Sequence, residues 1–111
     1  MAPSETTFGS AISDARKAKG WALKDLAARV LREDEEPISP QYLNDIEHDR
    51  RSPSSDHMVQ QLADALGIDR NYLYYLAGRW PKELRDKNLS QKQVSEVMVA
   101  FRRKLDKGGS S

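Results

Sequence analysis

The stretch ISPQYLNDIEHDRRSPS, residues 38–54, decides the fold of this chain. Ser39 is of a residue type that caps helices and Pro40 suits a first helical position, so this pair predicts the start of a helix. Leu43 and Ile46 follow at a three-residue spacing and predict the buried side of that helix. The side chains on the opposite face are polar, and the stretch ends in a basic turn.

Helix patterns fill the chain on both sides of this stretch, whereas alternating strand patterns are nearly absent. The residue types that precede them are typical of helix starts: Thr7, Ser39, Ser54 or Ser55, Asp69 and Ser90. The sequence therefore predicts an all-α fold, with five helices in a first domain and an additional C-terminal helix. We expect an N-terminal tail at 1–7, the five-helix domain at 8–80, a linker at 81–89, the C-terminal helix at 90–106 and a disordered tail at 107–111.

The composition excludes several classes of protein. The 111 residues contain no cysteine, and His48 and His57 lie apart without further ligands, so we expect no metal site and no cofactor. The sequence contains neither a nucleophile paired with a base nor a phosphate-binding loop, so nothing in it indicates an enzyme. No apolar run approaches the roughly 20 residues of a membrane span, and the N-terminus has no secretion signal. We therefore expect a soluble cytoplasmic protein without membrane contact.

Two short helices joined by a turn, the second with a polar face and a basic exit, form the arrangement that places a helix in the major groove of DNA. The amide side chains of Gln41 and Asn44 can each donate and accept, which matches the N6 and N7 positions of adenine. Arg50 and Arg51 leave the helix where phosphates of the DNA would lie. The alternative, that this face and its arginines are only solvated surface, stays open from the residues alone.

Three segments together carry a family resemblance: FGSAISDARKAKGWALKDLAARV at 8–30, ISPQYLNDIEHDRRSPS at 38–54 and VQQLADALGID at 59–69. In this order they resemble the lambda-repressor-like helix-turn-helix family, also called Cro/CI or XRE. The resemblance covers about Phe8 to Leu76. It implies a five-helix domain that binds double-stranded DNA. Through that DNA, the protein would associate with the nucleoid.

The resemblance also implies roles for individual residues. The base-facing positions are Ser39, Pro40, Gln41, Asn44 and Asp45. Together with the charges and helix starts, it indicates phosphate contacts for Lys19, Lys24, Tyr42, Arg50, Arg51 and Ser54. Glu47 usually has a structural, partly buried role in such proteins, which implies a pairing with Arg16.

The sequence departs from the family at three places. The family joins its second and third helices by a tight turn, whereas here 31–37 intervenes and is strongly acidic. We expect the second helix to extend by about one turn and carry these acids outward. Asp49 stands where a glycine is usual, and aspartate tolerates a left-handed conformation less well than glycine. Leu23 replaces a frequent glutamine, so phosphate anchoring is expected to move to Lys24 or Lys19.

The C-terminal helix has an apolar stripe that must be buried somewhere: Val94, Val97, Met98, Phe101 and Leu105. The stripe either folds back over the fifth helix and Trp80, or pairs with a second copy of the chain. We favour the dimer, because one helix-turn-helix unit covers little DNA, and a twofold dimer matches a palindromic site.

Two functions from different classes follow from the sequence. The first is a homodimeric transcription regulator, a repressor, that binds a palindromic operator with the helix at 39–48 in the major groove. The second is a protein-interaction adaptor or antitoxin-type partner in which DNA contact is secondary. Its protein-binding surface would be either the acidic loop Glu33–Glu36 or an aromatic group formed by Tyr72, Tyr74, Tyr75 and Trp80. For that aromatic group, packing inside the domain is the other reading.

Overall fold

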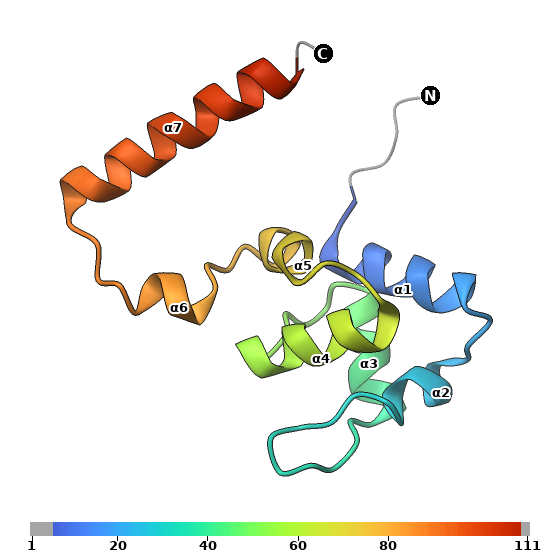
Figure 1. Cartoon of the computed structure of the whole chain (residues 1–111). Helices are drawn as coiled ribbons and strands as arrows, with labels where there is room; N and C mark the ends of the chain where they lie inside the picture. The colour runs from blue at the N-terminus through green and yellow to red at the C-terminus, as the bar shows by residue number, and fades with distance from the viewer. Residues whose placement is uncertain (1–5, 110–111) are drawn as a thin grey trace. The chain divides into compact units, whose positions relative to one another are not determined.

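The computed structural model describes residues 6–109, and the chain divides into two units, Met1–Pro81 and Lys82–Ser111. Within the described residues all regular elements are helices, so the all-α prediction is confirmed (Figure 1). The first unit contains α1 (Phe8–Ala18), α2 (Leu23–Ala27), α3 (Pro40–Glu47), α4 (Asp56–Leu66) and α5 (Arg70–Ala77). The second contains α6 (Lys82–Arg85) and α7 (Gln91–Gly109).

Four of the five helices of the first unit, α1, α3, α4 and α5, begin where the capping residues predicted them. The Thr7 hydroxyl oxygen accepts from the Ser10 N–H at 3.0 Å, and that of Ser39 accepts from the Tyr42 N–H at 3.0 Å. Each bond satisfies a backbone donor that has no partner inside the helix. Of the two candidates for α4, Ser55 is the cap, and Asp69 caps α5 as predicted.

Helix α3 is held from below by the core of the first unit. Leu43 and Ile46 are fully buried, and α3 packs against both α1 and α2. Burying such a side chain stabilises the fold by about 1.5–3 kcal/mol, so the two residues fix one face of α3 and leave the other to solvent. The rest of the core comes from the other four helices of this unit and from two residues of the α2–α3 connection, Val30 and Ile38: Phe8, Ile12, Leu26, Ala27, Val30, Ile38, Met58, Val59, Leu62, Ala63, Leu66, Leu73 and Tyr74.

The α2–α3 connection differs from the prediction, because the expected extension of the second helix does not form. Helix α2 ends at Ala27, and Leu31 pairs with Pro37 in an isolated antiparallel bridge. We call residues 31–37 the acidic hairpin. At its tip the Asp34 carboxylate accepts from the Glu36 N–H at 3.0 Å and pairs with Arg32 at 3.0 Å. These local bonds offer the backbone a turn in place of a helix, which is why the extension does not form.

Both contacts of Asp34 favour its charged form. The Glu36 backbone N–H, and after it the Arg32 guanidinium, lower the pKa of the Asp34 carboxyl below its usual value.

The base of the acidic hairpin is fastened to α4. The Leu31 N–H donates to Gln61 Oε1 at 3.0 Å, and the Leu31 carbonyl oxygen lies 2.9 Å from His57 Nε2. A carbonyl can only accept, so His57 Nε2 carries the proton in this contact. The Ile38 N–H then donates to the Val30 carbonyl at 3.0 Å and closes the hairpin directly before α3. The insertion therefore leaves the start of α3 in place.

The second unit contains more helix than the sequence analysis predicted. The expected linker at 81–89 includes the short α6, and α7 runs past the predicted end at 106 to Gly109. A basic residue, Lys107, lies in the last turn, where a cation complements the helix dipole. The tail expected to be disordered is therefore helical over 107–109; residues 110–111, like residues 1–5 of the N-terminal tail, lie outside the described residues.

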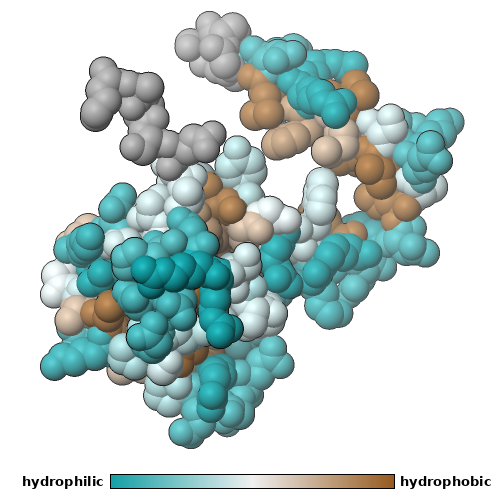
Figure 2. Space-filling view, turned by 180° about the vertical axis from the view of Figure 1, so that it is seen from behind, coloured by the Kyte–Doolittle hydropathy of each residue, from teal (hydrophilic) through white to brown (hydrophobic). Residues whose placement is uncertain are grey.

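The start of α7 matches the predicted capping box. The Gln93 N–H donates to Ser90 Oγ at 3.1 Å, and the Ser90 N–H donates to Gln93 Oε1 at 2.9 Å. The apolar stripe is exposed on this helix: Phe101 keeps 50% and Leu105 56% of its surface. Figure 2 shows helix α7 with hydrophobic residues along one side and hydrophilic residues along another.

Candidate nucleic-acid interface

The exposed face of α3 and its cap carry mostly polar residues. Ser39, Pro40 and Gln41 are exposed, and Asn44 and Asp45 are half-buried one turn further along. Asn44 and Asp45 follow Gln41 by three and four residues, so the three side chains lie next to one another on one helix face. The structure thus brings together the five residues that the sequence assigned to base reading.

Asp45 has a role that the sequence did not reveal. Its Oδ1 accepts from Gln41 Nε2 at 3.1 Å, and its carboxylate lies 3.6 Å from Arg50 Nη1 and 3.8 Å from Arg51 Nε. The carboxylate therefore sits among three groups of the same surface. Because it takes one N–H of the Gln41 amide, it orients that amide so that the oxygen and the second N–H remain for another partner.

Arg51 is supported from below by an aromatic ring. Its guanidinium lies 5.6 Å from the centre of the Tyr42 ring, a distance at which a cation is attracted to the ring face. The Tyr42 hydroxyl, predicted to bind phosphate, is buried and has no hydrogen-bond partner among the described residues. In this structure Tyr42 thus contributes its ring to the surface, and its hydroxyl faces inward.

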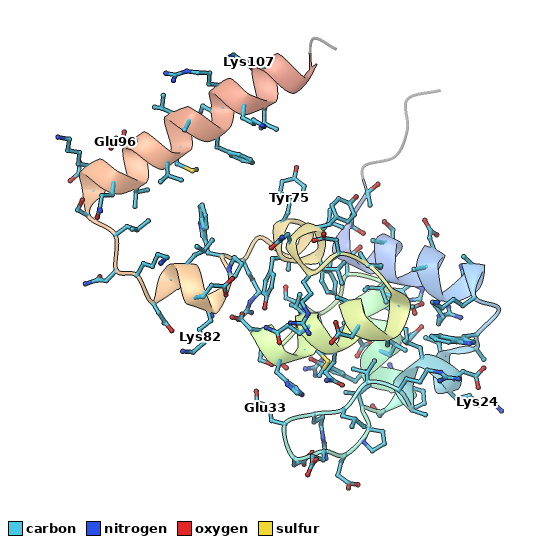
Figure 3. All side chains as sticks on the ribbon, in the orientation of Figure 1. Lys24, Glu33, Tyr75, Lys82, Glu96 and Lys107 are labelled. Carbon is cyan, nitrogen blue, oxygen red and sulfur yellow. The ribbon has the colours of Figure 1, made fainter. Side chains whose placement is uncertain are left out.

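A second group of cations gathers around Trp21, in the loop that leads into α2. Lys19 Nζ lies 5.3 Å and the Arg29 guanidinium 4.3 Å from the centre of its ring. Lys24 is exposed in the first turn of α2 and is labelled in Figure 3. Sequence reasoning missed Arg29, since a single exposed arginine has no signal until the fold places it over an aromatic ring.

A groove of about 530 Å³ lies between the acidic hairpin and the N-terminus of α4. Its walls include Ser39 from the start of α3, Ser54 beside the cap of α4, and Arg32 from the hairpin. Ser54 is therefore close to the recognition surface, by which we mean the exposed face of α3 with Ser39, as its predicted phosphate contact requires. Glu33, labelled in Figure 3, also lines the groove and extends from the hairpin, so negative charge borders this surface.

A buried ion pair fixes the orientation of α3. Arg16 Nε donates to Glu47 Oε2 at 2.7 Å, and Arg16 Nη2 donates to Glu47 Oε1 at 3.0 Å. A third bond runs from Arg16 Nη1 to the Trp21 carbonyl at 2.6 Å. The hydrogen bond to Glu47 raises the pKa of Arg16 above its usual value, so the guanidinium stays charged. The pair implied by the family resemblance thus connects α1, the loop before α2 and the end of α3.

Asp49 shows how the chain manages without the usual glycine. It adopts the left-handed conformation with φ at 58°, and its carboxylate accepts from the Thr7 hydroxyl at 2.6 Å and from the Gly9 N–H at 2.9 Å. Aspartate enters this region more readily than most residues, because its side chain is short and polar. Here those bonds tie the exit of α3 to the first turn of α1.

The aromatic group predicted as a protein-binding surface is only partly exposed. Tyr72 and Tyr75 are 44% and 70% exposed, and their rings stack with centres 6.4 Å apart. Tyr74 is buried, and its hydroxyl oxygen accepts from Gln60 Nε2 at 2.9 Å, so its assignment to a surface was wrong. Tyr74 is turned toward α4, as its bond to Gln60 shows, and α5 packs against that helix.

Neither a metal site nor a membrane span is found in the part of the chain that the structure describes. Residues 6–109 hold no group of three or more His, Cys, Asp or Glu side chains that could bind a metal ion. Among the same residues, no helix combines the length and the apolar character that crossing a bilayer requires.

Comparison with known protein families identifies the class of this chain. The helix-turn-helix family model matches residues 12–73, which is more than half of the chain and includes α2, α3 and α4. The chain belongs to the lambda-repressor-like (XRE) helix-turn-helix family and is a DNA-binding transcriptional regulator. Comparisons with curated proteins and with solved structures found no match.

Proposed function

We propose that this regulator is a repressor that binds a palindromic operator as a homodimer, with α3 in the major groove. The observation that carries the proposal is the polar face of α3, held in a fixed orientation by the Arg16–Glu47 pair and by buried Leu43 and Ile46. A rigid helix presents its side chains with the precision that base recognition needs. A repressor follows from the simplest mode of action, in which a bound dimer occludes the operator.

Gln41 and Asn44 are the proposed base-reading residues. A carboxamide can accept from the N6 amino group of adenine while donating to N7. The hydrogen bond from Gln41 to Asp45 supports this assignment, because it leaves the amide with one acceptor and one N–H for a base. Asp45 itself can only accept while ionised, so its carboxylate disfavours guanine, whose major-groove edge presents two acceptors.

The proposed phosphate contacts surround this reading face. Arg50 and Arg51 lie directly after α3 and are about two-thirds exposed, at 62% and 63% of their side-chain surface. Lys19 and Lys24 flank the start of α2, and Ser54 lies beside the N-terminus of α4. Such contacts position the protein on the duplex and make its affinity depend on salt.

Replacing Gln41 or Asn44 by alanine should weaken binding to the preferred duplex by about 1–3 kcal/mol each, because a bidentate contact with one base is lost. Binding to a scrambled duplex should stay unchanged, since phosphate contacts are retained. Fluorescence anisotropy titrations on both duplexes measure the two effects. Gln91→Ala, at an exposed position in the first turn of α7, is the matched control and should bind as the unmodified chain does. Unchanged affinity of both α3 variants for the preferred duplex would remove Gln41 and Asn44 from the proposal.

The apolar stripe of α7 supports the proposed homodimer. Val94, Met98, Phe101 and Leu105 follow one another at intervals of four, three and four residues, the spacing of a seam between two helices. Val94, Phe101 and Leu105 are exposed and Met98 is half-buried, which leaves apolar surface that a second copy of the same helix can cover. A twofold pair of recognition helices would then read the two halves of a palindrome.

Phe101→Asp should raise the dissociation constant of the dimer by about tenfold or more, because a charge would be buried in the seam. Sedimentation equilibrium measures the shift directly. Val99→Asp is the control, since Val99 is 44% exposed but lies outside the stripe on the same helix. Equal behaviour of the two variants, or a monomeric unmodified chain, contradicts a dimer formed through this stripe.

One observation supports the alternative function, that of a protein-interaction adaptor. The stacked pair Tyr72 and Tyr75, with Trp80 at 51% exposure, leaves aromatic surface uncovered on the first unit. Aromatic side chains of this kind are enriched at protein interfaces. A partner protein bound at this surface, together with failure to select any DNA motif, would favour the adaptor over the regulator that reads an operator.

A further inference from the structure

The two units of this chain carry opposite net charges. Residues 1–81 contain ten Lys or Arg and thirteen Asp or Glu, a net charge of −3. Residues 82–111 contain eight and four, a net charge of +4. The unit that matches the helix-turn-helix family is therefore acidic, although DNA is a polyanion.

Most arginines of the first unit are also engaged by its own carboxylates. Within the described residues six of its cations form ion pairs: Arg16, Arg32, Arg50, Arg51, Arg70 and Arg79. The loose pairs of Arg50 and Arg51 with Asp45 can open for a phosphate. The pair of Arg16 with Glu47 is buried and supplies nothing to a DNA partner, and the Arg70 guanidinium is neutralised by Asp64 at 2.8 Å. Beyond the α3 surface, the first unit offers the cations around Trp21 and the exposed Lys24, and its net charge stays negative.

The second unit places its cations on α7. Arg102, Arg103 and Lys104 are consecutive, and all three are exposed. No ion pair within residues 6–109 involves these three side chains. At about 3.6 residues per turn, Arg103 lies across the helix from Phe101, while Arg102 and Lys104 flank the apolar stripe. Seven residues of α7 are charged, and five of these are basic.

One side of α7 is therefore apolar and the other is polar with a basic excess. Lys92 and Lys107 fall on the side of Arg103, and Figure 3 shows Glu96 and Lys107 projecting from the same side of the helix. A dimer formed through the stripe would leave this side uncovered. The two faces can therefore serve different partners at the same time.

We infer that the basic face of α7 is a second nucleic-acid contact, which binds the phosphate backbone of double-stranded DNA without reading bases. Each phosphate that a cation neutralises releases counterions, and this release favours binding whatever the base sequence. The inference uses the family's DNA binding and does not need the proposed base-reading residues. It explains how a regulator with an acidic reading unit obtains non-specific affinity for DNA.

The test removes charge from α7 in the full chain. In the triple variant Arg102→Gln, Arg103→Gln, Lys104→Gln, glutamine keeps the helix propensity while removing the three cations. Affinity is measured for a preferred and for a scrambled duplex between about 50 and 200 mM salt. We expect the same loss, about tenfold or more, on both duplexes, and a slope of log K against log salt that is smaller by about 2–3 for each bound chain. Circular dichroism checks that the helix content is retained.

A matched control separates a local contact from the effect of total charge. Lys82→Gln, Arg85→Gln, Lys87→Gln removes three cations from the residues around α6 and should change the salt slope much less. An equal effect of the two triple variants would overturn the inference, as would an unchanged or higher DNA affinity of the α7 variant. Binding of the unmodified chain to anionic lipid vesicles, lost in the α7 variant while DNA binding is kept, would assign the face to a membrane surface instead and also overturn it.

Failure of the proposed α7 contact can be told apart from failure of the proposed base reading by Gln41 and Asn44. Variants at Gln41 and Asn44 change the difference between preferred and scrambled DNA, whereas the α7 variant changes both by the same factor. Loss of one effect with retention of the other therefore shows which of the two contacts is wrong.

Discussion

Glu47→Ala should lower the free energy of unfolding of the first unit by about 3–5 kcal/mol, because it leaves the Arg16 guanidinium charged, buried and without its partner. The Arg16 side chain is 11% exposed and that of Glu47 only 3% exposed, so the guanidinium has little access to water once the carboxylate is lost. Such a loss is a large fraction of the 5–15 kcal/mol typical of whole domains. Urea unfolding followed by circular dichroism measures it.

Two further variants test the cause of that loss. Removing both charges together, in Arg16→Met with Glu47→Met, should recover much of the stability, since no buried charge is left unpaired. Glu33→Ala, which removes an exposed carboxylate from the acidic hairpin, should change stability by no more than about 0.5 kcal/mol. The raised pKa of Arg16 keeps its charge throughout the neutral range, and stability that depends on this proton is lost only in strong alkali. A Glu47→Ala variant as stable as the Glu33→Ala variant would show that the pair does not fix α3.

Gly9→Ala should destabilise the first unit by about 3 kcal/mol, at the upper end of the usual cost of overpacking. A Cβ at Gly9 would lie 2.5 Å from the carbonyl oxygens of both Ile46 and Glu47, and neither backbone atom can move without shifting the end of α3. Helix propensity alone predicts the opposite sign, because alanine favours a helix over glycine by about 1 kcal/mol. The direction of the change therefore decides between close packing and propensity.

The midpoint of thermal unfolding measures the Gly9 effect. Asp14→Ala, at an exposed position of the same helix, is the control and should leave the midpoint nearly unchanged. An increase in the midpoint for Gly9→Ala would contradict the close approach of α1 to the end of α3.

The sequence predicts this fold well where local chemistry and burial agree. In α3, the cap Ser39, the first-turn Pro40 and the apolar pair Leu43 and Ile46 all indicate the same helix, and the structure contains it. The five-helix order of the first unit follows in the same way. The Arg16–Glu47 pair was reached only through the family resemblance, since two residues 31 positions apart show no pairing signal of their own.

The parts that the sequence did not predict depend on contacts between distant residues. The acidic hairpin replaces the expected extension of α2 because Asp34 forms a local turn and because Gln61 and His57 hold Leu31 from α4. Asp49 was expected to be a poor substitute for glycine, yet it caps the first turn of α1. These bonds are visible only once α1, α3 and α4 are packed together.

The recognition surface shows the same division. The polar positions of α3 could be chosen from helix spacing, and the structure places all five on its exposed or half-buried face. The bonds of Asp45 to Gln41 and to the two arginines after α3 could not be predicted, because they depend on side-chain rotamers and on the turn at the end of the helix. The contribution of these residues to base reading stays a prediction.

Selection of bound duplexes from a random DNA library tests the central claim, which is sequence-specific DNA binding through α3. We predict that the full chain enriches one motif with twofold symmetry, whose half-sites lie about one helical turn apart. The Asn44→Ala chain should lose the preference at one position in each half-site while still binding DNA. No enriched motif from the unmodified chain, or the same motif from the Asn44→Ala chain, would contradict the claim.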